Sequence, residues 1–158
     1  MSGYDRQYIG WREWVSLPAL QIPHLKAKID TGARTSCLHA FDVESFQQNG
    51  QKMVSFGIHP VQDNNQIELF REAVVVDERP VTDSGGHTEE RLVIKTDILV
   101  GDQSWSIEMT LTNRDSMKLR MLLGRTGLGG RFLVVPDASY LTGNIPDAHE
   151  CFPEGGNQ

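Results

Sequence analysis

The amino-acid sequence predicts a mainly β protein with little helix. Apolar and polar residues alternate with a period of two over much of the chain, and β-branched runs such as "AVVV" are typical of strands. No long segment repeats apolar residues at positions i, i+3 and i+4, the spacing of an amphipathic helix. With 158 residues, the chain is long enough for one hydrophobic core and too short for two comfortable domains. We therefore expect a single all-β domain.

The strands expected in the first half of the chain form two hairpins. Residues 9–20 and 24–30 make the first hairpin, which places Asp30 at the end of its second strand. Residues 53–61 and 67–76 make the next pair, and the turn-rich "QDNNQ" separates them. The first hairpin therefore ends in a carboxylate.

The second half continues the same pattern. Residues 91–100 and 104–112 are expected to pair about the turn "GDQ", and residues 118–124 form a short apolar strand that stops at a glycine. The polar segment 77–90 contains a Gly-Gly pair and is expected to be the exposed, mobile tip of a hairpin. The strands thus lie on both sides of a polar loop.

The folded domain is expected to end near residue 135. The following segment is rich in Pro, Gly and Asn, a composition typical of irregular chain. We therefore divide the sequence into a domain over residues 1–135 and an irregular C-terminal tail over residues 136–158.

Charge and hydropathy exclude several classes of protein. The formal net charge of −6 and the isoelectric point near 5.3 argue against binding to nucleic acid, which depends on Lys and Arg at phosphates. No apolar run approaches the roughly 20 residues of a transmembrane helix, and the N-terminus lacks the apolar core of a signal peptide. We expect a soluble, cytoplasmic protein that binds neither membrane nor nucleic acid. Residues 114–131 differ from the rest, because five basic residues and one acid give this segment +4.

The segment "AKIDTGARTS" contains the first candidate for chemistry. An apolar strand stops at Asp30, and Thr31 and Gly32 follow at once. Asp-Thr-Gly is good turn chemistry, because Asp and Thr cap backbone amides and Gly accepts positive φ. It is also what a catalyst needs, since a strand end is a rigid platform for an exposed carboxylate. These residues alone leave both interpretations open.

A second motif, "MLLGRTGL" at residues 121–128, favours the catalytic interpretation. Two bulky apolar residues followed by Gly, some ninety positions after Asp-Thr-Gly-Ala, form the paired signature of the retroviral-type aspartic peptidases. The chain resembles that family, and most closely the bacterial group labelled ATP-dependent zinc proteases, whose members are often encoded beside ATP-grasp glutamate ligases. The resemblance runs from "IGWREWVSLPAL" to "MLLGRTGL". It implies a closed retropepsin-like (acid protease) β-barrel with a flap hairpin over residues 1–135.

The resemblance also implies roles for particular residues. Asp30, Thr31 and Gly32 would be the catalytic triplet. The predicted substrate-binding residues lie beside it, on the flap and after the second motif: Ala33, Arg34, Gly85, Gly86 and Arg125. The Gly-Gly pair would form the flap that closes over a peptide, although an ordinary flexible loop has the same composition.

The mechanism implies a homodimer. Aspartic peptidases use two carboxylates, one ionised to activate water and one protonated to polarise the scissile carbonyl. This chain has a single Asp-Thr-Gly. The resemblance to the dimeric viral enzymes therefore implies that a second Asp30 comes from another copy of the chain across a two-fold axis.

The sequence departs from the viral pattern at Arg34. Viral members carry an acid there, which pairs with the Arg that follows the later glycine, whereas here Arg34 has the same sign as Arg125. Either a different acid serves Arg125, or both arginines are available to bind a substrate carboxylate. Together with Lys26 and Lys28, they favour an acidic peptide, such as a glutamate-rich tail.

No cofactor or metal site is predicted. The sequence has no His-Glu-x-x-His, no closely spaced Cys/His cluster and no phosphate-binding Gly-x-x-x-x-Gly-Lys, and "GRTGLGGR" opens no helix after such a pattern. Cys37 and Cys151 form no disulfide framework. Two alternatives to the aspartic peptidase remain open. One is a zinc-dependent protease in which Asp30 and a histidine such as His39 hold the metal, and the other is a noncatalytic peptide-binding module.

Overall fold

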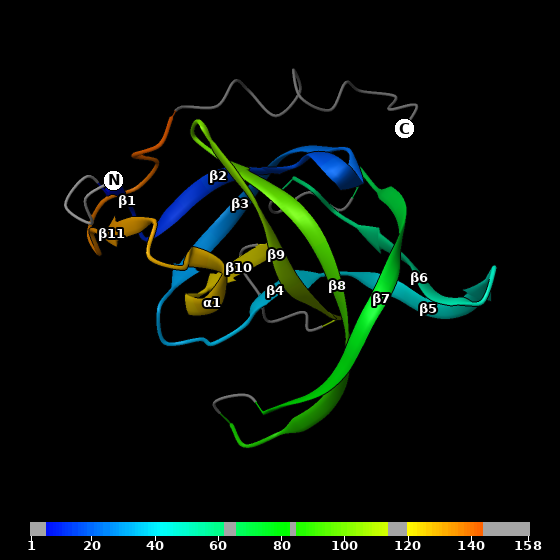
Figure 1. Cartoon of the computed structure of the whole chain (residues 1–158). Coiled ribbons are helices and arrows are strands. Elements are labelled where there is room, and N and C mark those ends of the chain that lie inside the picture. Colours follow the sequence, from blue (N-terminus) through cyan, green and yellow to red (C-terminus); the bar gives the residue numbers. More distant parts are fainter. Residues whose placement is uncertain (1–5, 62–65, 83–84, 114–119, 144–158) are drawn as a thin grey trace.

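The main sheet of the protein closes on itself. The computed structural model describes residues 6–61, 66–82, 85–113 and 120–143. In chain order the elements are β1 (Gln7–Ile9), β2 (Arg12–Leu17), η1 (Pro18–Leu20), β3 (Ile22–Asp30), β4 (Ser36–His39), β5 (Phe41–Gln48), β6 (Gln51–Ile58), β7 (Leu69–Thr82), β8 (Thr88–Val100), β9 (Gln103–Thr112), β10 (Met121–Gly124), α1 (Arg125–Leu128) and β11 (Phe132–Val134). The sheet order is β2-β3-β10-β4-β9-β8-β7-β6-β5, and β2 also pairs with β8. That extra pairing joins β2, β3, β10, β4, β9 and β8 into a ring (Figure 1).

The core fills the inside of this ring. In β3, Leu25, Ala27 and Ile29 are buried, whereas the side chains between them lie on the opposite surface. Because successive side chains of a strand point to opposite faces, Asp30 belongs to the surface turned away from the core, which we call the outer face. Leu123 and Met109 are fully buried in the same core on β10 and β9. The core thus fixes which side of the sheet carries the carboxylate.

The fold class expected from the sequence is confirmed. The ring is built from strands, and among the described residues α-helix is limited to the single turn α1. The hairpin of β2 and β3 and the hairpin of β8 and β9 both form, the latter with Val100 opposite Gln103. Within the described ranges, none of the helices reaches the length and apolarity needed to span a membrane.

Several elements differ from the expectation. Strands β4 and β5 were not predicted, and neither were the short strands β1 and β11 or the helical turn that opens at Arg125. Residues 18–20 leave the predicted strand as a 3-10 turn, because Pro18 cannot donate to a sheet ladder. β4 escapes a search for alternation because all four of its residues are buried.

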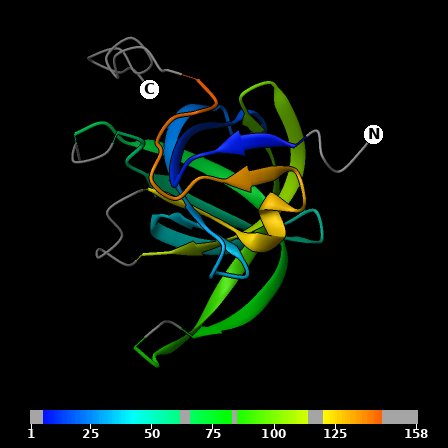
Figure 2. The same cartoon turned by 90° about the vertical axis from the view of Figure 1, so that its left-hand side faces the viewer.

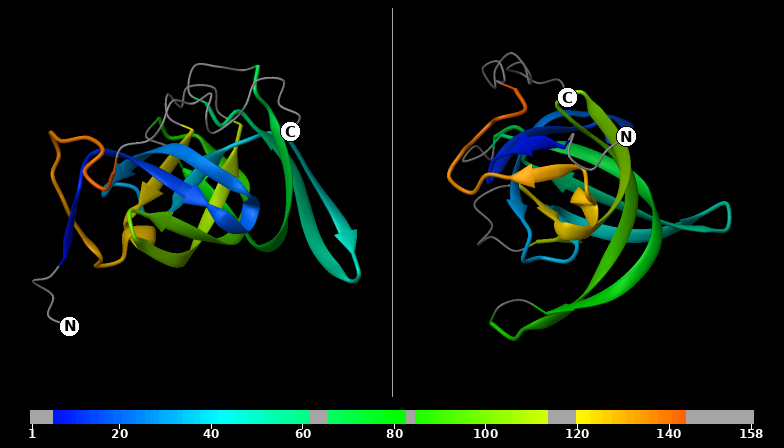
Figure 3. Two further views of the ribbon diagram at one scale, coloured as in Figure 1. Left: turned by 90° about the horizontal axis from the view of Figure 1, so that it is seen from above. Right: turned by 60° about the vertical axis from the view of Figure 1, so that its left-hand side comes forward.

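The polar segment 77–90 is mostly strand. β7 continues to Thr82, and β8 begins at Thr88, with pairs running from Asp77 opposite Val93 to Thr82 opposite Thr88. The prediction of an exposed hairpin was right, but the ladder extends much further than its polar sequence suggested. We call residues 77–93 the flap hairpin. It projects from the ring, as does the hairpin of β5 and β6 (Figures 1 and 3).

The two ends of the described chain meet in a small parallel sheet. β1 pairs with β11 in the register Gln7 to Phe132 (Figure 2). Residues 136–143 contain no regular strand or helix, and they lie against β2, where Tyr140 stacks on Trp14 with ring centroids 5.8 Å apart. The remainder of the predicted irregular tail, 144–158, lies outside the described residues.

Candidate functional site

Strand β10 brings the two sequence motifs together. β10 lies between β3 and β4, parallel to β3 and antiparallel to β4. In this register Gly124 is opposite Asp30, and Leu122 is opposite both Lys28 and Cys37. Residues 30–35, which we call the Asp loop, therefore pass over the end of β10 on their way from β3 to β4. The pairing of the motifs inferred from the sequence is a direct strand contact.

Asp30 is both a turn residue and an accessible carboxylate. Its Oδ1 accepts a hydrogen bond of 3.0 Å from the N–H of Gly32, and its carbonyl accepts one of 3.2 Å from Ala33. The side chain is half-buried on the outer face. The local bonds fix the orientation of the carboxylate without removing it from the surface, which is what a group that activates water requires. The two interpretations of Asp-Thr-Gly are therefore compatible.

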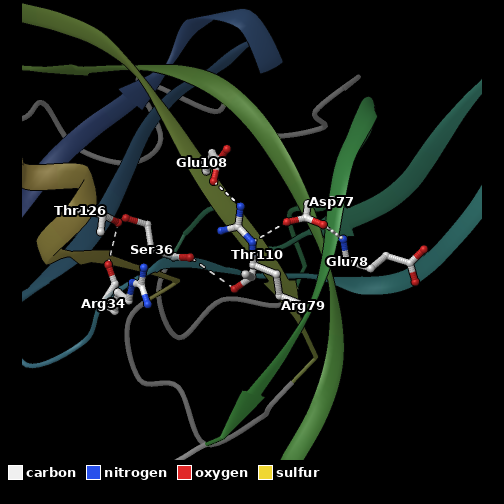
Figure 4. Close-up of polar contacts among 8 residues, drawn as sticks. All are labelled: Arg34, Ser36, Asp77, Glu78, Arg79, Glu108, Thr110 and Thr126. Atoms are coloured by element: carbon white, nitrogen blue, oxygen red, sulfur yellow. Dashed lines mark hydrogen bonds and ion pairs between the residues drawn. The ribbon is translucent and has the colours of Figure 1, made fainter.

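A backbone scaffold after β10 holds the Asp loop. The N–H of Arg125 donates to the carbonyl of Ala33 at 2.8 Å, and the N–H of Thr126 donates to the carbonyl of Arg34 at 3.1 Å. The Thr126 hydroxyl donates to the same Arg34 carbonyl at 2.6 Å (Figure 4). Ser36 completes the scaffold, because its hydroxyl accepts a 3.0 Å hydrogen bond from the N–H of Gly124. Sequence reasoning missed both hydroxyl groups, since Ser and Thr are common in any loop.

Arg125 takes its partners from the backbone. Its Nη1 donates to the carbonyls of Thr31 and Gly32, at 3.1 and 3.3 Å. The sequence left two fates open for this arginine, an unidentified acid or a substrate carboxylate. One end of the guanidinium spans the loop that carries Asp30 and braces it, and the substrate-binding role of Arg125 stays a prediction. Arg34 is exposed beside it.

Gly124 is the point where strand and loop approach most closely. A Cβ at this position would lie 2.8 Å from the carbonyl carbon of Thr35 and 2.9 Å from the carbonyl oxygen of Ala33. Both are backbone atoms, which cannot rotate away. Glycine is therefore required here by space.

We expect Gly124→Ala to displace the Asp loop. The loss should be about 2 kcal/mol in the free energy of unfolding, typical of overpacking, together with a fall of at least about 10-fold in any activity that depends on Asp30. Urea denaturation and a peptide hydrolysis assay measure the two effects. Gly130→Ala is the matched control, because among the described residues the nearest atom to its Cβ would be at the far end of the Arg6 side chain, 3.8 Å away. Equal behaviour of the two variants would contradict the close approach.

The predicted flap glycines lie at the end of the flap hairpin. Gly85 and Gly86 are exposed, and Gly86 has φ of +86°, a conformation that favours glycine. In Figures 1 and 2 the end of this hairpin lies on the same side of the ring as the loop between β3 and β4. The base of the hairpin is tied to the ring, because Arg79 on β7 donates to Glu108 on β9 at 2.7 Å (Figure 4).

Arg79 and Asp77 also shift each other's pKa. Arg79 also donates to Asp77 at 2.7 Å, and this bond holds the pKa of the Asp77 carboxyl below its ordinary value. The pKa of Arg79 is raised in turn, first by Glu108 and then by Asp77. These residues are largely exposed, so the network fixes side-chain orientation and contributes little to stability.

The donor set for the zinc alternative is not assembled in the described part of the chain. No group of three or more His, Cys, Asp or Glu residues there could hold a metal ion. The N–H of His39 donates to the carbonyl of Arg120, before the start of β10, whereas Asp30 lies opposite Gly124 at the other end. A strand of this length separates them by roughly 13 Å. The structure therefore does not bring His39 to Asp30.

The topology and the paired motifs together define a protein of the retropepsin type. The chain belongs to the RimB-like family, described as the retropepsin-like aspartic endopeptidase RimB, whose sequence profile matches residues 8–144. The family expected from the motifs is therefore confirmed.

The chain is also similar to parts of larger proteins. It is 45% identical over 137 residues to a "Probable alpha-L-glutamate ligase" of Parasynechococcus marenigrum, and 45% identical over 139 residues to one of Shewanella pealeana. These alignments cover 87% and 88% of this chain but only 29% and 30% of the ligases. The chain thus spans less than a third of the length of these relatives.

A solved structure has the same fold. The crystal structure of Lpg0085 from Legionella pneumophila, a protein of unknown function (DUF785), superimposes with a TM-score of 0.72 and 26% sequence identity. The match covers 86% of this chain and 98% of that one. The ring with its projecting strands is therefore an established arrangement.

Proposed function

We propose that the chain is an aspartic peptidase that acts as a homodimer, with one Asp30 from each copy. The observation that carries this proposal is the accessible Asp30 carboxylate, fixed at a strand end by its bond to Gly32 and braced by Arg125 through two loop carbonyls. Membership of an aspartic endopeptidase family supports the same chemistry.

The proposed mechanism needs two carboxylates that meet on a two-fold axis. Two carboxylates about 3 Å apart cannot both ionise, so one Asp30 keeps a proton and the other is charged. The charged one accepts a proton from water, which attacks the scissile carbonyl, and the protonated one donates to the carbonyl oxygen. The C–N bond of the resulting adduct then breaks, the carboxyl that took the proton from water gives it to the leaving amine, and the adduct hydroxyl returns its proton to the other carboxylate. Thr31 and Gly32 shape the meeting point, and the flap hairpin excludes bulk water over the peptide.

Charge around the Asp loop supports an acidic peptide as substrate. Lys28 is exposed on the same strand as Asp30, and Arg34 is exposed in the loop itself. Such a rim attracts carboxylates, although basic residues of this kind can also balance acids on a solvated surface. A zinc-dependent protease and a noncatalytic peptide-binding module are the alternative functions, and loss of activity on exhaustive chelation would favour the first of them.

We expect the specific activity to fall on dilution, because separation of the copies destroys a two-carboxylate site. An activity titration beside sedimentation equilibrium should show the loss at the concentration where the dimer dissociates. Excess Asp30→Asn chains should lower the activity of wild-type chains further, since mixed dimers hold one normal carboxylate. Full activity per chain in a demonstrably monomeric sample would rule out the shared site.

A further inference from the structure

The charged residue next to Asp30 on the outer face of β3 is Lys28. Side chains two positions apart on a strand point to the same face, so Lys28 and Asp30 share the outer face with their Cα atoms about 7 Å apart. Ile29, between them in the sequence, is buried in the core on the opposite face. Lys28 itself is exposed. A ligand at the Asp30 carboxylate therefore has Lys28 as its neighbour along β3.

The strands on either side of β3 offer Lys28 no acid. Its cross-strand neighbours are Arg12 on β2 and Leu122 on β10. Like charges directly opposite each other in a sheet repel, so Arg12 makes this position less favourable for a lysine. Within the described part of the chain, no carboxylate forms an ion pair with Lys28. Lys28 is therefore not the counter-charge of a neighbouring acid.

The other two cations on the outer face of this hairpin have aromatic partners within the chain. The guanidinium of Arg12 lies 5.0 Å from the ring centroid of Tyr140, and the ammonium of Lys26 lies 5.3 Å from that of Trp14. Cation–π contacts of this kind attract the charged group to the ring face. Among the described residues, no ring lies beside Lys28 in this way. Its ammonium is thus the one of the three that is available to a ligand.

We propose that Lys28 is a specificity-determining residue that binds a carboxylate of the substrate beside the scissile bond. The inference rests on the proposed peptidase function and assigns its acidic preference to one side chain. Residues of an extended peptide are about 3.3 Å apart, so a peptide with its scissile carbonyl at Asp30 brings a residue within two positions of that bond over Lys28. A Glu or Asp there accepts a charge-assisted hydrogen bond from the ammonium, which is stronger than the neutral acceptor of Gln or Asn provides.

Lys26 is the matched control for this role. It lies on the same face of the same strand, but its Cα is about 13 Å from that of Asp30. Lys26→Gln and Lys28→Gln make the same change in net charge, so both weaken the general attraction of an acidic peptide to this surface. A loss confined to Lys28→Gln therefore identifies a local contact.

The test measures peptide binding without turnover. Two short neutral peptides differ only in a central Glu or Gln, and fluorescence anisotropy gives their affinities for full-length Asp30→Asn protein. We expect the Glu peptide to bind about 5- to 20-fold more tightly, the lower part of the range for a hydrogen bond to a charged group because Lys28 is exposed. In the Lys28→Gln background that ratio should fall below about 2-fold. Lys28→Arg and Lys26→Gln should both keep it above about 4-fold.

The possible failures of this test have different meanings. A Glu preference that survives Lys28→Gln, an equal loss in Lys26→Gln, or equal binding of the two peptides to Asp30→Asn protein would overturn the assignment of Lys28. Absence of binding by either peptide would also overturn it. Hydrolysis of the Gln peptide by wild-type protein as fast as the Glu peptide would leave the peptidase function standing without Lys28. A Lys28-dependent Glu preference in a protein that hydrolyses neither peptide would instead count against the peptidase function alone.

Discussion

Asp30→Asn is expected to remove peptide hydrolysis and leave the fold intact. The amide cannot accept the proton of the attacking water, and loss of a general acid–base group costs about 10²- to 10⁴-fold in rate. We expect the larger end of that range, because both halves of the proposed shared site lose their carboxylate. The shape of the side chain and its bond from the N–H of Gly32 are retained. The measurement is the kcat of purified protein at a concentration where the dimer is populated.

A second Asp-to-Asn change separates chemistry from charge. Asp97 is an exposed acid on β8, a strand of the same ring. It accepts a hydrogen bond of 2.8 Å from the hydroxyl of Ser106 on β9. Asp97→Asn makes the same change in net charge and should keep full activity. The free energy of unfolding should move by less than about 1 kcal/mol in either variant. Retained turnover in Asp30→Asn would exclude the aspartic mechanism.

The sequence placed the Asp-Thr-Gly turn at the end of a strand correctly because this part of the candidate site is local. Asp30 ends a strand, and Gly32 belongs to the turn that follows, so neighbouring letters carry both facts. The pairing with Gly124 is a long-range contact, but two distinct motifs marked its ends. The hydrogen bonds by which Ser36 and Thr126 support the Asp loop could not be predicted, because a hydroxyl group in a loop has no sequence pattern that identifies its partner.

There are also physical reasons why some strands were not predicted from the sequence. β4 is buried on both faces, because all four of its residues are buried, so the sequence "SCLH" shows no alternation. The second half of β7, residues 77–82, is largely exposed and polar. Its composition does not favour a strand, and the backbone pairing with β8 keeps it extended. In both cases the tertiary environment decides the conformation. The flap hairpin was therefore expected in the right place and with the wrong length.

Glu13 is the clearest residue that the sequence could not assign. Glu13 lies in the same phase of β2 as the buried Val15 and Leu17, where an apolar residue is expected, and it is fully buried. Its Oε2 accepts hydrogen bonds from the N–H groups of Gly10 and Leu141, at 2.6 and 2.9 Å. Its Oε1 accepts two from Thr142, from the N–H at 3.1 Å and from the hydroxyl at 2.8 Å. One carboxylate thus joins β2 to residues more than a hundred positions away.

We expect Glu13→Ala to be the most destabilising single change in this set. It leaves the buried N–H of Gly10 and the half-buried donors of Thr142 without their acceptor, and an unsatisfied buried donor costs about 1–3 kcal/mol. The expected loss is about 3 kcal/mol in the free energy of unfolding, which for a domain of this size lowers Tm by roughly 6–12 °C. Urea denaturation and thermal unfolding both measure it. Glu44→Ala, at an exposed position on β5, should change the free energy by less than about 0.5 kcal/mol.

Glu13→Gln tests whether a side chain of the same shape can replace the carboxylate at this position. One end of the amide is a donor, so one of the two oxygens, each of which now accepts two hydrogen bonds, would be replaced by an NH₂ that faces at least one N–H group. We therefore expect Glu13→Gln to lose at least about 1 kcal/mol, despite its nearly identical volume. Full stability of this variant would show that the carboxylate is replaceable. Both Glu13 variants should lose stability and keep any Asp30-dependent activity at temperatures below their unfolding transition. That result would show that Glu13 holds the chain ends together and takes no part in the proposed chemistry at Asp30.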